Sequence, residues 1–269
     1  FWDKFSDDGF KRLINEGHFF RNAQFGYVPT YTGPGHASIF TGTTPSSHGI
    51  VANSWFDKSS ENYLYCAQDD AQITIGDTSA AGKMSPKNML TTTFSDELKL
   101  FSEAKVIGIS LKDRGAILPA GHSGDAAYWM GNDGKWISSS YYMNSLPKWL
   151  QKVNDYYPAK KHLTGEWKVK NDFNHNLDSA FINNGGSAIK TTPLGNTILK
   201  DLAIAVLKNE KLGQGKTTDV FTISFSSPDY IGHKYGPHAG EIMDTYIKLD
   251  KDIAKLLKVI DNKVGFKNT

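Results

Sequence analysis

A threonine hydroxyl placed directly before a Gly-Pro-Gly segment is the first feature of this sequence that could do chemistry. Thr32 precedes that segment (33–35), and residues 37–40 behind it are predicted to form a helix. Proline suits the first turn of a helix, and glycine lets a ligand approach the backbone. Free N–H groups at a helix N-terminus favour an anion, so the hydroxyl could attack phosphorus and leave a phosphothreonine there. The alternative is that Thr32 only caps the helix.

A lysine and an arginine two positions apart follow a predicted buried strand, residues 106–110. In an extended segment such side chains point to the same side, so Lys112 and Arg114 would present two positive charges together. Adjacent cations repel unless an anion lies between them. Phosphate suits the pair, because arginine offers two parallel hydrogen bonds and lysine a point charge. The alternative is a solvated pair of loop charges, since such residues are mostly exposed.

A carboxylate and an imidazole follow a second predicted buried strand, residues 220–225. Asp229 and His233 are four positions apart, which is one turn if the segment is helical, so both could reach one ion. An oxygen and a nitrogen ligand of this kind suit zinc. The alternative is that Asp229 caps a helix and His233 lies on the surface, because a catalytic zinc needs three protein ligands and this segment offers two.

The three features together indicate one chemistry more strongly than any of them does alone. They combine a hydroxyl, a pair of metal-ligand residues and a pair of cations, each at a predicted end of a strand or a helix. This combination predicts metal-assisted phosphoryl transfer.

The elements that must position these residues alternate between helices and apolar strands. Helices are predicted at 7–17, 37–40, 198–207 and 241–260, strands at 106–110 and 220–225, and a hairpin at 126–130 and 135–140. Such alternation predicts an α/β fold with a core sheet flanked by helices, in which reactive groups lie where strands end and helices begin. Residues 1–115 and 193–269 are assigned to this core. Residues 116–192, which are aromatic, rich in Asn and Gly and weakly periodic, are assigned to an inserted cap region.

Composition excludes several classes of protein. The 269 residues are 39% hydrophobic and 22% charged, and no apolar run approaches the roughly 20 residues needed to cross a bilayer. This excludes a membrane span and argues against disorder. A formal net charge of +2 excludes a strongly basic nucleic-acid binder. Cys66 is the single cysteine, so an internal disulfide is excluded.

Three separated motifs resemble the alkaline phosphatase superfamily, in the branch with a threonine nucleophile and specifically the PafA-like phosphomonoesterases. They are PTYTGPGHAS at 29–38 with TGTTP at 41–45 and HGIVAN at 48–53, SLKDRGAILPAGH at 110–122, and SSPDYIGH at 226–233 followed by Gly236-Pro237. The motifs occur in family order and the likeness runs nearly end to end. It implies an alkaline-phosphatase-like core sheet and hydrolysis of small-molecule phosphate monoesters with two zinc ions.

The resemblance also implies a role for each candidate residue. Thr32 would be the nucleophile and a ligand of one zinc, and Asp229 and His233 would bind the other. Asn53 and the Lys112/Arg114 pair would hold the non-bridging oxygens of the phosphoryl group. Because two cations suit the dianion of a monoester, this pair argues against the phosphodiesterases of the related nucleotide pyrophosphatase branch, which generally lack it.

Several metal ligands of the family have no counterpart in this sequence. The family places an aspartate on a strand before residues 7–17, and an Asp-His pair and a later histidine after residues 241–260. No Asp-His dipeptide occurs here. The chain is therefore expected to be the middle portion of a longer enzyme, with an incomplete metal site and unpaired sheet edges.

Three hypotheses remain open on the sequence. The first is a two-zinc alkaline phosphatase, the second a phosphodiesterase of the same superfamily, and the third a non-catalytic fragment that binds phosphate without metal turnover. By the resemblance, the protein is expected to be a monomer that bacteria export to the periplasm or beyond.

Overall fold

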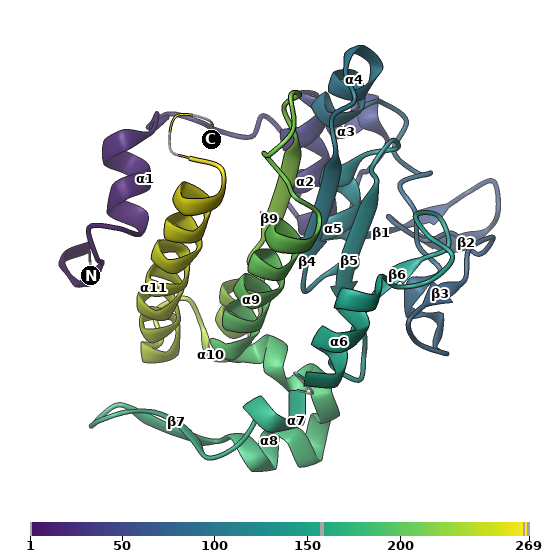
Figure 1. Cartoon of the computed structure of the whole chain (residues 1–269). Helices are drawn as coiled ribbons and strands as arrows, with labels where there is room; N and C mark the ends of the chain where they lie inside the picture. Colours follow the sequence, from purple (N-terminus) through teal and green to yellow (C-terminus); the bar gives the residue numbers. More distant parts are fainter. Residues whose placement is uncertain (1, 157–158, 266, 268–269) are drawn as a thin grey trace.

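The two buried strands predicted from the sequence lie side by side in this computed structural model, which describes residues 2–156, 159–265 and 267. The central sheet has the strand order β3-β6-β5-β4-β9 (Figure 1). Its strands are β3 (Thr74–Ile75), β4 (Val106–Ser110), β5 (Ala126–Met130), β6 (Trp136–Ser139) and β9 (Val220–Ser224). β4 is parallel to both neighbours, whereas β6 is antiparallel to β5 and β3. Because Ser110 pairs with Ser224, β4 and β9 end at the same level.

Helices cover both faces of this sheet, as Figure 1 shows. The long helices α9 (Leu194–Asn209) and α11 (Gly240–Lys263) lie on one side, and α2 (Thr32–Thr41) and α5 (Asp113–Ala120) on the other. Side chains of β5 alternate between the two hydrophobic clusters, with Tyr128 on the α9 side and Trp129 on the α5 side. This is the pattern of a strand buried on both faces.

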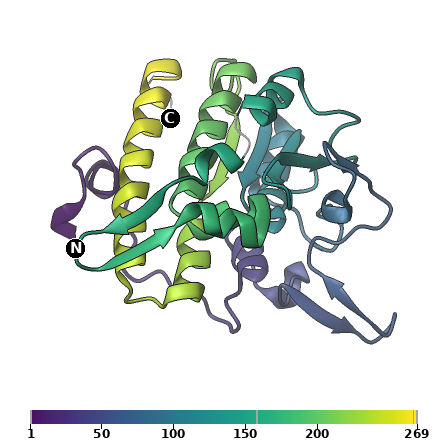
Figure 2. The same cartoon turned by 90° about the horizontal axis from the view of Figure 1, so that it is seen from below.

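The remaining elements are short. The other helices are α1 (Phe10–Glu16), α3 (Pro45–His48), α4 (Phe94–Phe101), α6 (Lys148–Tyr156), α7 (Ala159–His162), α8 (Leu177–Asn184) and α10 (Ser227–Tyr235), with 3-10 turns at Trp2–Lys4, Ala80–Gly82 and Gly185–Thr191. Two hairpins stand outside the central sheet, β1 (Ser54–Asp57) with β2 (Asn62–Tyr65) and β7 (Glu166–Val169) with β8 (Phe173–Asn176). The second hairpin lies across α9 and α11 (Figure 2), where Trp167 Nε1 donates to Asp244.

The predicted α/β core with flanking helices is confirmed, and so are the buried strands and the hairpin of β5 and β6. The β1–β2 and β7–β8 hairpins were not predicted. Residues 116–192 contain β5 and β6 of the central sheet as well as α6 to α8, so their assignment to a separate cap region stays a prediction. The outermost residues of the predicted core (1, 266, 268 and 269) lie outside the described residues. None of the described helices is long and apolar enough to cross a membrane.

β9 forms one edge of the sheet. Across residues 2–156, 159–265 and 267 it pairs with β4 alone, so its second edge carries unpaired backbone groups. Every open sheet has two such edges, so the expectation that missing strands leave this one unpaired stays a prediction.

Candidate active site

All six predicted site residues line one cavity of about 610 Å³. They are Thr32, Asn53, Lys112, Arg114, Asp229 and His233. The parallel pairing of β4 and β9 explains why Lys112, Arg114, Asp229 and His233 converge, because the segments that follow two neighbouring parallel strands leave the sheet at the same edge. Thr32 and Asn53 reach this edge through contacts of α2 with the end of β9 and with Asn53. The predicted convergence of these side chains is therefore confirmed, and their chemical roles stay predictions.

Thr32 is the first residue of α2, and the N-cap position is occupied by Tyr31. The structure therefore does not support the alternative that Thr32 is the cap. Its neighbour Gly33 is tightly enclosed, since a Cβ there would lie 3.2 Å from the carbonyl oxygen of Ala52 and from Cys66 Sγ. A larger residue after Thr32 would push α2 away from the segment that carries Asn53.

The expectation that backbone N–H groups of α2 bind the anion is wrong for most of the first turn. The N–H of Gly33 donates to Asn53 Oδ1 at 2.8 Å, and that of Gly35 donates to the carbonyl of Tyr31 at 2.9 Å. Pro34 has no N–H. Side chains must therefore supply most of the donors for a phosphoryl group. Asn53 is suited to this, because an Oδ1 that accepts from Gly33 leaves the Nδ2 group free to donate.

His36 connects the start of α2 to the end of β9, a role that the sequence did not indicate. Its Nδ1 donates to the carbonyl of Thr32 at 2.8 Å, and its Nε2 accepts from Ser224 Oγ at 2.9 Å. Burial is the main reason that the pKa of His36 lies below its ordinary value, so the ring is neutral at neutral pH. Its position four residues after Thr32 is the sequence signal that could have identified it.

Lys112 and Asp229 form an ion pair in the lining of the cavity, although the sequence predicts different ligands for them. The Lys112 ammonium contacts Asp229 Oδ2 and lies 4.5 Å from the centre of the Tyr230 ring. Its side chain is only 4% exposed, and burial lowers the pKa of Lys112 despite the neighbouring carboxylate. The second carboxylate oxygen, Oδ1, lies 3.5 Å from His233 Nε2.

Arg114 is held by a tyrosine that the sequence did not indicate. Its Nη1 donates to Tyr65 Oη at 2.9 Å, and Tyr65 donates to Asp113 Oδ1 at 2.5 Å. Asp113 lies between the two predicted cations in the sequence, which is a signal that could have been used. Tyr65 comes from β2, in a hairpin that the sequence analysis did not predict.

Asp229 and His233 have the donor types that zinc prefers, but they do not make a complete zinc site. In the part of the chain that the structure describes, no group of three or more His, Cys, Asp or Glu side chains is placed to hold a metal ion. Thr32, the third predicted ligand, is assigned to the other ion. The residues present therefore fit only part of a zinc site.

The sequence model of the type I phosphodiesterase / nucleotide pyrophosphatase family matches residues 3–269. The chain belongs to this family. The predicted resemblance to PafA-like members of the alkaline phosphatase superfamily is also confirmed. The crystal structure of wild-type alkaline phosphatase PafA matches this family member with a TM-score of 0.95 and 36% identity, over 99% of this chain and 57% of that chain. The alkaline-phosphatase-like fold is thereby shown.

Curated relatives of this family member carry names that describe phosphate chemistry. Alkaline phosphatase PafA of Elizabethkingia meningoseptica is 37% identical over 98% of this chain and 54% of its own length. Alkaline phosphatase PhoV of Synechococcus elongatus is 38% identical over 98% of this chain and 53% of its own length. A protein of Myroides odoratus named calcium-transporting ATPase is 40% identical over 98% of this chain and 54% of its own length. The chain thus spans about half the length of the curated relatives it matches.

Proposed function

We propose that this chain carries the phosphoryl-binding part of a zinc-dependent alkaline phosphatase that hydrolyses phosphate monoesters. The observation that supports this most directly is the cavity shared by Thr32 and the two cations Lys112 and Arg114. A monoester dianion can be matched by two positive charges in a partly buried site, where electrostatic attraction is stronger than in water. The relatives named alkaline phosphatase support the same proposal.

In the proposed reaction, Thr32 Oγ1 forms a bond to phosphorus while the ester P–O bond breaks. The hydroxyl loses its proton, and the departing oxygen leaves as an alcohol once it has gained one. Water then cleaves the phosphothreonine, which releases inorganic phosphate and restores the hydroxyl. Asn53 Nδ2 and the guanidinium of Arg114 would donate to the non-bridging oxygens, where charge is concentrated in phosphoryl transfer.

Zinc belongs to the proposal through the donors of Asp229 and His233 and through the resemblance, which implies two ions. When bound, zinc would supply Lewis-acid stabilisation of charge on the reacting oxygens. The proposal requires ligands in addition to the described residues, and the relatives are about twice as long as this chain. Export to the periplasm or beyond and a monomeric state complete the proposal.

A phosphodiesterase is the second candidate, because the matching family model is named after phosphodiesterases and nucleotide pyrophosphatases. A diester carries one negative charge fewer and needs room for a second organic group. The Lys112/Arg114 pair therefore favours monoesters. The name of the Myroides relative is compatible with the same residues, since an ATPase also cleaves a bond to a terminal phosphoryl group.

The test compares hydrolysis of an aryl phosphate monoester and an aryl phosphate diester, together with the zinc content of the purified protein. It uses the longest protein that the gene of this chain encodes, beside the 269-residue chain. We expect preferential monoester hydrolysis with bound zinc in the longer protein, and negligible activity in the 269-residue chain. Preferential diester hydrolysis would favour the second candidate. Phosphate binding without zinc or turnover in both proteins would favour a non-catalytic phosphate-binding protein.

A further inference from the structure

The two edges of the Arg114 guanidinium lie in different environments. Nη1 donates to Tyr65 Oη at 2.9 Å. Nε is buried and has no hydrogen-bond partner among the described residues. A buried donor without a partner is costly, and it indicates a group that a ligand is meant to satisfy. Nε and Nη2 together form the planar edge with which arginine binds two oxygens of one phosphate. Arg114 lines the site cavity, so this edge is the part of the guanidinium left for a ligand there.

The Tyr65 hydroxyl makes two hydrogen bonds, one as acceptor and one as donor, and chemistry fixes which partner takes which role. A guanidinium can only donate and a carboxylate can only accept, so Tyr65 accepts from Arg114 and donates to Asp113. Asp113 Oδ1 also accepts the backbone N–H of Arg114 at 2.6 Å, in the first turn of α5. Burial and then the Asp113 carboxylate raise the pKa of Tyr65, so the hydroxyl keeps its proton at alkaline pH.

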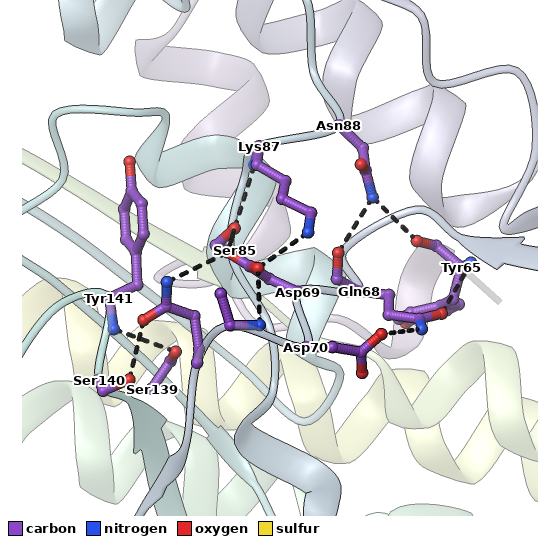
Figure 3. Close-up of polar contacts among 12 residues, drawn as sticks. Tyr65, Gln68, Asp69, Asp70, Ser85, Lys87, Asn88, Ser139, Ser140 and Tyr141 are labelled. Atoms are coloured by element: carbon purple, nitrogen blue, oxygen red, sulfur yellow. Dashed lines mark hydrogen bonds and ion pairs between the residues drawn. The ribbon is translucent and has the colours of Figure 1, made fainter. Parts of the chain in front are cut away.

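The backbone around Tyr65 is itself fixed on both sides. The side-chain amide of Asn88 donates to the carbonyls of Tyr65 and Gln68, each at 3.2 Å (Figure 3). The N–H of the next residue, Cys66, donates to the carbonyl of Asn53 at 2.9 Å. Tyr65 and Asn53, the other proposed phosphoryl ligand, therefore lie close together at the open end of the β1–β2 hairpin.

We propose that Tyr65 is a positioning residue, which holds Arg114 so that its Nε–Nη2 edge faces the dianionic phosphoryl group of a monoester. This inference rests on the proposed function, since it assigns a ligand to the same site. Among the described residues, Asp113 is the anion that forms an ion pair with Arg114, with Oδ1 3.7 Å from Nη1. Without the hydroxyl between them, the guanidinium would turn toward this carboxylate, and its free edge would no longer face the substrate. Tyr65 thus keeps Arg114 and Asp113, which form an ion pair at 3.7 Å, from forming a direct hydrogen bond.

The experiment replaces Tyr65 by Phe, which removes the hydroxyl and keeps the ring that lies 5.9 Å from the guanidinium. Tyr63→Phe is the matched control, because Tyr63 lies on the same strand and is 77% exposed. Both changes are also made in an Arg114→Ala background. The enzyme is the longest protein that the gene encodes, the substrates are an aryl phosphate monoester and diester, and inorganic phosphate is the inhibitor.

We expect Tyr65→Phe to lower kcat/KM for the monoester about tenfold and to weaken inhibition by inorganic phosphate by a similar factor. The diester rate should change less than twofold. In the Arg114→Ala background the same change should lower monoester kcat/KM less than twofold, because the residue that Tyr65 positions is gone. Tyr63→Phe should change neither rate, and the melting temperature shows whether each variant is folded.

Several outcomes would overturn the inference. If Arg114→Ala loses monoester activity while Tyr65→Phe does not, Tyr65 has no positioning role although the proposed function stands. An equal loss from Tyr65→Phe in both backgrounds, or on both substrates, would show a general structural effect. If Arg114→Ala itself loses nothing, the proposed phosphoryl site fails together with this inference. Should Tyr65→Phe fail to fold, Asp113→Asn takes its place, with a smaller loss and the same preference for the monoester expected.

Discussion

The two sides of the site cavity differ in how their charged groups are held. On one side, the Arg114 side chain is 18% exposed and is bonded to Tyr65, which in turn is bonded to Asp113. On the other side, the Asp229 and His233 side chains are 49% and 83% exposed. Burial of a charge is tolerated only with partners, so Arg114 is held in place by Tyr65 and Asp113 and keeps one edge for a ligand. The other side offers a carboxylate and an imidazole to solvent and lacks a third ligand among the described residues.

Lys112 links the two sides, since it is buried and its ammonium contacts Asp229 Oδ2. The free oxygen of Asp229, Oδ1, is the one that faces His233. A cation bound between Asp229 and His233 would therefore share the carboxylate with Lys112. The comparison indicates that this chain alone fixes the phosphate-binding side, and that the metal-binding side depends on further groups.

The largest expected effect is that of replacing Thr32, because the groups on both sides of the cavity act on the phosphoryl group that Thr32 attacks in the proposed function. Thr32→Ala should lower kcat for the monoester by roughly 10⁴-fold or more, about 5 kcal/mol, because the nucleophile acts together with the groups around it. A phosphorylated peptide containing residue 32 should be trapped at low pH from the wild type and be missing from the variant. Thr44→Ala, in an exposed threonine outside the cavity, is the control. Turnover of Thr32→Ala at the wild-type rate would contradict the assignment of the nucleophile.

The next largest effect is that of replacing either cation of the phosphate-binding side. Lys112→Ala and Arg114→Ala should each lower monoester kcat/KM. The expected loss of transition-state stabilisation is about 2–4 kcal/mol per variant, the usual contribution of one preorganised donor to a charged transition state. Diester hydrolysis should fall less, because a diester has one charged oxygen fewer. Steady-state kinetics on both substrates measure the split. Losses of the same size on both substrates would count against the monoesterase proposal.

The difference between the two sides also explains what the sequence could predict. Lys112 and Asp229 each follow a buried strand, and the carboxyl ends of neighbouring parallel strands meet at one edge of a sheet. Their convergence therefore follows from local patterns. Tyr65 could not be found in this way, because it comes from a hairpin whose strands have no buried residue and carry no clear apolar alternation.

The sequence also could not predict which side chains of the site contact one another. The contact between Lys112 and Asp229 joins residues 117 positions apart, and spacing along the chain does not specify which anion a buried lysine meets. The same applies to the N–H of Gly33, which the sequence presents as a free donor and the fold assigns to Asn53. Patterns identified the residues of the site, whereas the fold decided their partners.

A smaller effect concerns the stability of the phosphate-binding side. Asp69 is buried beside the segment that carries Tyr65, and it accepts from Lys87 Nζ at 2.9 Å and Ser85 Oγ at 2.7 Å (Figure 3). Burial raises its pKa, but the bonds from Lys87, Ser85 and Gln72 outweigh burial and hold the pKa of Asp69 at about 2. Asp69→Asn should therefore lower the free energy of unfolding at pH 7 by about 2 kcal/mol.

The stabilising effect of Asp69 should depend on pH in a defined direction. A carboxylate whose pKa is lower in the folded state stabilises the fold above its unfolded pKa of 3.8, and this contribution is lost as the pH falls toward about 2. Urea unfolding at pH 7 should thus show the full difference between wild type and Asp69→Asn, and the difference should shrink below pH 4. Asp70→Asn, at the exposed neighbouring position, should change the free energy by less than about 0.5 kcal/mol. A difference that is constant down to pH 2 would contradict the charge-based explanation.

The smallest expected effect is that of zinc on the melting temperature of the 269-residue chain. In this chain Asp229 and His233 have no further ligands from a longer protein. Two ligands are one fewer than a catalytic zinc takes from protein, and Lys112 already occupies one oxygen of Asp229. We expect a dissociation constant of about 100 µM or weaker by calorimetry. At 100 µM zinc this corresponds to a stabilisation of at most about 0.4 kcal/mol, or roughly 1 °C in melting temperature. Asp229→Asn should abolish even this shift, whereas His122→Ala, in a histidine that does not line the cavity, should leave it unchanged. Binding tighter than 1 µM that Asp229→Asn abolishes would show that the chain completes a zinc site by itself, and the contrast between the two sides of the cavity would then disappear.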